Sequence, residues 1–221
     1  MTTQSLKTGY AALQAERDRD WSPEQLRANA ATRATLVAKY DPRNHAQPGE
    51  QIDDFTLIGE AGETIRRDDL IANGPAVLIF YRFGGCPACN VALPQYDRLL
   101  YPALERAGIP LVAVSPQTPV DPALRARHGL RLTLASDPNN RLGDALGITF
   151  EPGDKPAIQS GQSWIGATTG TGTWVLPQPT VLILDGDGSI RFVAVSPDWM
   201  DRPEPETILT ALPEASVAAA A

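Results

Sequence analysis

Cysteine and histidine are scarce in this 221-residue sequence, with two of each, and basic residues are outnumbered by acidic ones. Two neighbouring cysteines cannot build the spread framework of bridges that stabilises a small secreted scaffold. Lysine and arginine total 19 against 26 acidic residues, and the net charge is -7. The sequence therefore lacks the basic footprint of a nucleic-acid-binding protein, and we expect no nucleic-acid partner.

Long apolar runs are absent as well. No stretch approaches the roughly 20 residues that a membrane-spanning helix needs, so we expect no membrane partner. The segment from Met1 to Arg17 has no apolar core like that of a secretory signal. We therefore expect a cytoplasmic, thiol-reducing location, where a single cysteine pair indicates reversible redox chemistry.

The overall composition is that of a packed globular protein, with 43% hydrophobic and 20% charged residues. We expect a helical extension over residues 1–47 and one main domain over residues 48–213. Within that domain, residues 151–173 are rich in Gly, Ser and Thr without a period, which predicts a loop insertion. Residues 214–221 predict a flexible tail.

The extension carries the patterns of two helices. Leu6, Tyr10 and Leu13 form a short apolar stripe at helical spacing, which ends because the next position on that face is Arg17. We interpret the stripe as a docking face against the main domain, with a homodimer contact as the alternative. Ser22 begins the second helix, which runs towards Tyr40. Its apolar positions are Leu26, Leu36 and Val37.

The main domain alternates short apolar runs with helical patterns, which predicts an α/β fold with a central mixed sheet flanked by helices. The predicted strands are 54–57, 76–81, 111–114, 132–135, 180–184 and 190–195, the last two forming a hairpin. The predicted helices are 89–107, 122–129, 141–146 and 205–212.

The segment from Cys86 to Cys89 reads Cys-Pro-Ala-Cys and follows the apolar run 76–81. A thiol at a helix N-terminus meets unpaired backbone N–H groups and the positive end of the helix dipole, which favour the reactive thiolate. We therefore expect Cys86 to be the exposed nucleophile. Cys89 lies on the same helical face and is expected to attack the intermediate formed at Cys86. Gly84 and Gly85 would let the backbone turn tightly before it.

Three other interpretations compete for the cysteine pair. A zinc site would need His45 and His128 as further ligands, and neither shows metal-ligand spacing, so we expect no metal and no other cofactor. A structural disulfide would gain little from closing so short a loop. The third interpretation is two inert buried cysteines. It requires the Cys-Pro-x-Cys motif to occur at a strand-to-helix junction by chance, which is improbable.

The order of elements around this motif resembles the thioredoxin superfamily. Pro94 lies five residues after Cys89, where thioredoxin-like proteins carry a kinking proline. The segment 178–182, Gln-Pro-Thr-Val-Leu, is similar to the one that places a cis-proline opposite the cysteine pair. The resemblance thus implies a cis bond at Pro179, with Gln178 offering backbone pairing to a substrate. An ordinary trans proline in an edge strand is the alternative.

Within that superfamily, residues 81–90 (Tyr-Arg-Phe-Gly-Gly-Cys-Pro-Ala-Cys-Asn) resemble the peroxiredoxin-like branch of the AhpC/TSA, or redoxin, family. Residues 114–118 and 136–138 are similar to that group too, and the resemblance runs from about residue 49 to residue 212. It implies Cys86 and Cys89 as catalytic residues. The substrate-binding residues it implies are Tyr81, Arg82, Gly85, Pro87, Gln178 and Pro179.

The sequence departs from the peroxiredoxin pattern at the groups that activate peroxide. Ile79 and Phe83 stand where the family has Pro and a hydroxyl residue, and the family's later arginine aligns near Pro179. Arg82 and Arg191 are the candidates to replace that arginine, against the interpretation of both as salt-bridged surface residues.

Three functions remain open at this stage. The resemblance implies a peroxidase in which Cys86 attacks a hydroperoxide, Cys89 resolves it, and thioredoxin or glutathione reduces the resulting disulfide. The intact CxxC motif also suits a thioredoxin-type reductase of protein disulfides. The third possibility is a non-catalytic redox-sensing or binding module.

Overall fold

The computed structural model describes residues 5–153, 155, 157, 158 and 162–213. The tail predicted over residues 214–221 lies outside this range. The helices are α1 (Leu6–Asp20), α2 (Pro23–Lys39), α3 (Arg67–Ile71), α4 (Pro87–Arg106), α5 (Pro122–His128), α6 (Arg141–Ala145), α7 (Ile165–Thr169) and α8 (Pro205–Thr210). The strands are β1 (Thr56–Gly59), β2 (Thr64–Arg66), β3 (Ala76–Phe80), β4 (Leu111–Ser115), β5 (Thr133–Ser136), β6 (Thr149–Phe150), β7 (Leu176–Pro177), β8 (Thr180–Leu184) and β9 (Ile190–Val195).

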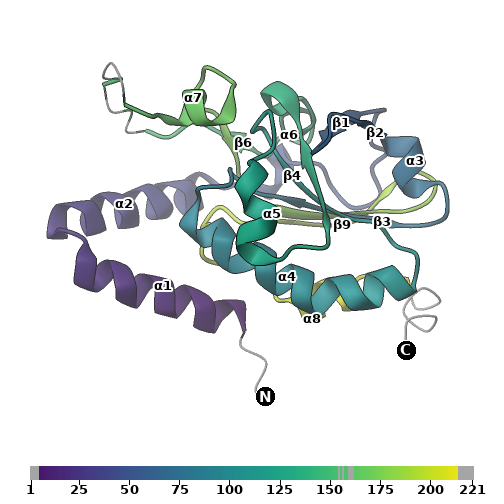
Figure 1. The fold of residues 1–221 in the computed structure, drawn as a ribbon, viewed down its shortest axis with the longest axis horizontal. Coiled ribbons are helices and arrows are strands. Elements are labelled where there is room, and N and C mark those ends of the chain that lie inside the picture. The colour runs from purple at the N-terminus through teal and green to yellow at the C-terminus, as the bar shows by residue number, and fades with distance from the viewer. Residues whose placement is uncertain (1–4, 154, 156, 159–161, 214–221) are drawn as a thin grey trace.

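Seven of these strands form one mixed sheet in the order β2-β1-β5-β4-β3-β8-β9. The strands β3, β4 and β5 run parallel, whereas β1, β2, β8 and β9 pair antiparallel with their neighbours. Figure 1 shows helices on both sides of this sheet, with α1 and α2 at one side of the molecule. The predicted α/β fold with a central mixed sheet is confirmed.

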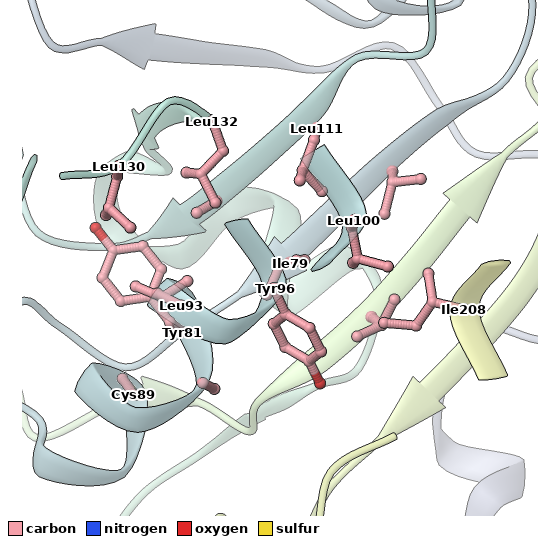
Figure 2. Close-up of a cluster of buried hydrophobic side chains, with 14 of the residues drawn as sticks. Ile79, Tyr81, Cys89, Leu93, Tyr96, Leu100, Leu111, Leu130, Leu132 and Ile208 are labelled. Carbon is pink, nitrogen blue, oxygen red and sulfur yellow. The ribbon is translucent and has the colours of Figure 1, made fainter. Parts of the chain in front are cut away.

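Every residue of β3 is buried, because the sheet is covered on both faces. Val77 and Ile79 belong to the hydrophobic cluster that packs against α4 and α8, whereas Leu78 and Phe80 belong to the cluster on the opposite face. Figure 2 shows the first cluster, with Cys89 at one edge of it in that view. The cysteine pair therefore lies where the end of a buried strand meets a packed helix.

The N-terminal stripe docks on the main domain, as predicted. Leu6 and Tyr10 are buried in the same cluster as α4, and Leu13 packs against it. The stripe is thus occupied within the chain, which argues against its use as a dimer contact. The expectation for α2 is only partly met: Leu36 packs on the cluster, but Val37 is 51% exposed.

Several local elements differ from the prediction. The strand predicted at 54–57 begins at Thr56. Neither β2 nor α3 was predicted. The strand β2 gives little signal because Thr64–Arg66 holds a single apolar side chain. The segment predicted as a loop over 151–173 contains α7. No helix in the described part of the chain is long and apolar enough to cross a membrane.

The prediction of a cis peptide bond at Pro179 is wrong. Within the described residues the cis peptide bond joins Thr118 to Pro119. The backbone on both sides of the Gln178–Pro179 bond is paired with neighbouring segments: the Gln178 N–H donates to the carbonyl of Ile148, and the Pro179 carbonyl accepts the N–H of Ser196. The segment is thus paired on both sides of a trans bond as it enters β8.

Candidate active site

Cys86 lies at the N-cap of α4, separated from the end of β3 by residues 81–85, so the predicted strand-to-helix junction is present. Its N–H donates to the Phe83 carbonyl (3.1 Å), and its own carbonyl accepts the N–H of Asn90 (3.0 Å). The helix starts at Pro87, two residues earlier than predicted, and carries Pro94 in its interior. Both sulfurs thus sit at the first turn of a long helix.

The loop before Cys86 is fixed at Gly84. Its N–H donates to Gln117 Oε1 (2.8 Å), and its carbonyl accepts from Asn90 Nδ2 (3.1 Å) and Arg127 Nη1 (3.2 Å). His128 Nε2 hydrogen-bonds Asn90 Oδ1 (2.9 Å), so this histidine supports the loop although the sequence assigned it no role. These bonds hold the loop that leads to Cys86.

The glycines are required here for space and not for backbone twist. Neither Gly84 nor Gly85 has a positive φ. A Cβ atom on Gly84 would collide with the Asp121 side chain, and one on Gly85 would lie 3.2 Å from the Phe83 ring. The close approach of Asp121, which caps α5, therefore explains Gly84.

Arg202 is the functional residue that the sequence reasoning missed. Its Nη2 donates to Cys89 Sγ (3.3 Å), its Nε donates to the Trp199 carbonyl (3.0 Å), and its Nη1 is buried without a hydrogen-bond partner. Arg191, one of the two arginines considered from the sequence, instead pairs with Asp185 at 2.6 Å. The cysteine pair therefore has a buried guanidinium beside it.

The segment that carries Arg202 is held by the helices around it. The Glu204 carboxylate accepts the N–H groups of Leu6 (2.9 Å) and Lys7 (3.0 Å) at the start of α1. The Tyr96 hydroxyl, from α4, donates to the Pro203 carbonyl (2.7 Å). The N-terminal extension thus helps to position the arginine that contacts Cys89.

The hydrogen bond between the two sulfurs moves their pKa values in opposite directions. The S–H of Cys86 donates to Cys89, and this bond together with burial raises the pKa of the Cys86 thiol well above its usual range. Burial also raises the pKa of Cys89, but the bonds from Cys86 and Arg202 and the Arg202 charge outweigh it and hold that pKa well below its usual range. The resting negative charge therefore lies on Cys89, whereas the helix-dipole argument had placed it on Cys86.

Cys86 is recessed and not exposed as predicted, with 2% of its surface accessible. It lines a cavity of about 400 Å³, which we name the Cys86 pocket. One wall comes from the extension and consists of Arg17, Trp21, Gln25, Ala28, Asn29 and Thr32. The main domain contributes Arg82, Phe83, Pro87 and Ala88 around the sulfur, and Phe150, Pro152 and Trp199 farther out. Cys89 is not among the lining residues.

Two of the predicted substrate-binding residues meet in this pocket. Arg82 and Pro87 line it beside Cys86, and Gly85 is exposed next to the sulfur without lining it. The Arg82 guanidinium carbon lies 4.6 Å from the centre of the Trp199 ring.

The other three predicted residues lie elsewhere. Tyr81 is fully buried in the core beneath the site. Gln178 lines a neighbouring cavity of about 530 Å³ between α2 and residues 147–153. Pro179 is buried near Arg202. Within the described ranges no group of three or more His, Cys, Asp or Glu side chains could hold a metal ion.

The fold and the site define a class of protein: a thioredoxin-like thiol oxidoreductase with a reduced Cys-Pro-Ala-Cys pair at the start of a helix. The family follows from the sequence comparison. Residues 48–193 match the AhpC/TSA family, so the chain belongs to that family. A search of the curated proteins found no match.

Solved structures share the fold at low sequence identity. Peroxidoxin BcpB from Mycobacterium tuberculosis is 20% identical, with a TM-score of 0.57 over 79% of this chain and 98% of that one. A peroxiredoxin-like protein from Aquifex aeolicus is 15% identical, with a TM-score of 0.56 over 74% of this chain and 84% of that one. A cysteine-to-serine mutant of peroxiredoxin 6 from Arenicola marina is 16% identical, with a TM-score of 0.58 over 75% of this chain and 72% of that one.

Proposed function

We propose that this chain is a peroxidase that reduces hydroperoxides with Cys86 as the attacking thiol and Cys89 as the resolving one. The observation that carries the proposal is the buried Arg202 guanidinium beside the cysteine pair, with Nη1 left without a partner. Breaking an O–O bond places negative charge on the leaving oxygen, which a preorganised donor stabilises. Arg82 lines the Cys86 pocket, and Arg202 contacts Cys89 outside it. Together they supply the cationic donors that the sequence lacks at the family's usual positions.

The arrangement supports the following steps. Cys89 takes the proton of Cys86, and the Cys86 thiolate attacks the terminal oxygen of the hydroperoxide. The O–O bond breaks, the alkoxide takes a proton from solvent and leaves as the alcohol, and Cys86 becomes a sulfenic acid. Cys89 then attacks that sulfur, and its proton leaves with the hydroxide as water. The net reaction turns one hydroperoxide and two thiols into an alcohol, water and a Cys86–Cys89 disulfide.

A thioredoxin-type or glutathione-type thiol completes the cycle, which suits a reducing compartment such as the cytoplasm. We assign the chemistry to residues 48–213, with residues 1–47 as an extension and 151–173 as an insertion. The rival function, reduction of protein disulfides, keeps the CxxC pair but is less well supported because Pro179 is trans and Cys86 is recessed.

A single-turnover experiment tests the proposal. The reduced protein and its Cys86→Ser and Cys89→Ser variants are mixed with hydrogen peroxide or cumene hydroperoxide, and the products are identified by mass. We expect a disulfide in the wild type, a sulfenic acid trapped by dimedone in Cys89→Ser, and no reaction in Cys86→Ser. Rapid reduction of insulin disulfides without peroxide turnover would make the protein a disulfide reductase. Failure with every oxidant would make it a binding module.

A further inference from the structure

We propose that the Cys86–Cys89 disulfide is reduced by a small thiol that carries a carboxylate, bound by Arg17 and Arg82, and not by a folded protein such as thioredoxin. The inference builds on the proposed function, because it names the reductant of the same site. Its support comes from the shape and the charge of the Cys86 pocket.

The pocket suits a small molecule. Its volume of about 400 Å³ lies within the range of small-ligand sites, roughly 300–1,000 Å³. The sulfur that a reductant must attack is 2% exposed, and α1 and α2 of the extension form one wall above it. A folded reductant would have to bring its own cysteine past this wall.

Arg17 is a buried charge without a carboxylate partner among the described residues. It is 6% exposed, and its Nε is buried without a hydrogen bond. Its Nη1 donates to Met200 Sδ (3.1 Å) and, at 3.5 Å, to Asn29 Oδ1, both neutral groups. Its guanidinium carbon lies 4.8 Å from the centre of the Trp21 ring. A side chain so placed keeps donors available to a ligand in the pocket.

Arg82 is in a similar position on the opposite side of the pocket. It forms no salt bridge in the described structure, and its Nε is buried without a partner. Its guanidinium group contacts the Trp199 ring, and both side chains line the pocket with Cys86. Arginine in a fixed plane is well suited to bind a carboxylate through two parallel hydrogen bonds.

The charge of the pocket contrasts with that of the molecule. The whole chain has a net charge of -7, yet no Asp or Glu lines the Cys86 pocket, which contains two arginines. A buried charge without a counter-charge is costly. In the disulfide that the reductant attacks, neither sulfur carries a charge, so the cysteine pair does not neutralise Arg17 and Arg82. A ligand carboxylate would provide the missing counter-charge.

The reduction balances with two such thiols. The first thiolate attacks Cys86 Sγ, the Cys86–Cys89 bond breaks, and the electron pair leaves on Cys89, which Arg202 stabilises. The second thiolate attacks the small thiol's sulfur in the mixed disulfide and releases Cys86. Two thiols become one small disulfide, and their two protons pass to the cysteine pair and to solvent.

The test uses the full chain oxidised by diamide, with the disulfide verified by its mass. Its reduction rate is measured with glutathione and with three thiols of similar size: anionic 3-mercaptopropionate, neutral 2-mercaptoethanol and cationic cysteamine. Rates are compared per concentration of thiolate. We expect 3-mercaptopropionate to exceed 2-mercaptoethanol by on the order of tenfold, the ratio given by one charge-assisted hydrogen bond. We also expect glutathione to act faster than thioredoxin at equal concentration.

Substitutions then assign the preference to the two arginines. Arg17→Met and Arg82→Met should each lower the ratio of anionic to neutral rates, and Arg17→Lys should restore part of it. The control is Arg19→Met, because Arg19 lies on the same helix but is exposed and outside the pocket. Because the ratio is taken within one sample, a variant with a smaller folded fraction still gives a valid result.

Three results would overturn the inference: a wild-type ratio near one, a ratio unchanged in both methionine variants, or faster reduction by thioredoxin than by glutathione. Since diamide forms the disulfide, these results do not depend on peroxide. A protein that fails to react with peroxides but prefers anionic thiols would overturn only the proposed function.

Discussion

At Cys89, three donors favour the thiolate: the Cys86 S–H, the Arg202 side chain and the backbone N–H of Arg82. Arg202 is the one that a substitution can remove without removing a cysteine. The interaction is mutual, because the Cys89 charge raises the pKa of Arg202 against the effect of burial, which lowers it. The guanidinium therefore stays charged at every pH at which the protein is folded.

We predict that Arg202→Met raises the pKa of the cysteine pair. A cation favours the thiolate, so its loss favours the thiol, and the first titration step moves to higher pH. If that pKa rises by about one pH unit, about nine tenths of the thiolate is lost at any pH below both values. Titration followed by the ultraviolet absorbance of the thiolate measures this, and Arg202→Lys should give a smaller rise. Arg191→Met, which breaks the pair with Asp185 away from the site, is the matched control. Equal titration curves for wild type and Arg202→Met would contradict the assignment.

The difference between Cys86 and Arg202 shows what the sequence could predict at this scale. The spacing of the cysteines after an apolar run identifies Cys86 and Cys89, because the helix start is encoded locally by the residues around Pro87. Arg202 lies 113 residues from Cys89 and reaches it through an irregular segment between β9 and α8. No local spacing relates the two, so only the packing of the whole fold brings them together.

Among the elements, α1 joins the extension to the site. Leu6 is fully buried against the cluster around α4, and its N–H group is one of the two that Glu204 accepts. The same short segment of α1 therefore contributes both to the core and to the position of the chain that carries Arg202.

We predict that Leu6→Ala lowers the free energy of unfolding by about 2–5 kcal/mol, the usual cost of truncating a buried leucine. Val37→Ala is the control, because Val37 is 51% exposed and should change stability by no more than about 0.5 kcal/mol. Urea denaturation at neutral pH measures both. A loss of under about 1 kcal/mol in Leu6→Ala would mean that α1 is only loosely docked.

The elements that the sequence predicted best are those with a clear pattern of apolar residues bounded by turn residues. The hairpin of β8 and β9 has the predicted bounds, because both strands are apolar runs on either side of a turn rich in Asp and Gly. Helical spacing identifies Leu36 and Val37 as apolar positions of α2 but does not say which of them meets the neighbouring domain. Pro179 was misjudged for the related reason that its trans form depends on pairing with residues 148 and 196.

At the scale of the whole molecule, two opposite fields act on an anionic thiol. The net charge of -7 repels it at a distance, whereas Arg17 and Arg82 attract it inside the Cys86 pocket. At about 0.15 M salt the Debye length is about 8 Å, so the surface charges beyond that distance are largely screened. Added salt also screens the attraction between the two arginines and an anionic thiol that approaches the pocket through solvent.

The response of the reduction rate to salt distinguishes the two fields. If the pocket arginines dominate, the rate with 3-mercaptopropionate falls as ionic strength rises, because salt weakens the final attraction. If the net charge dominates, the same rate rises, because salt removes the repulsion. As ionic strength increases, we predict that the rate with 3-mercaptopropionate falls for the wild type and that the rate with neutral 2-mercaptoethanol changes little. For Arg17→Met we predict that the rate with 3-mercaptopropionate rises, because this variant keeps the net repulsion and loses half of the local attraction. Measuring the three rates between low and physiological salt decides the matter, and a rising rate in the wild type would show that the surface charge outweighs the pocket.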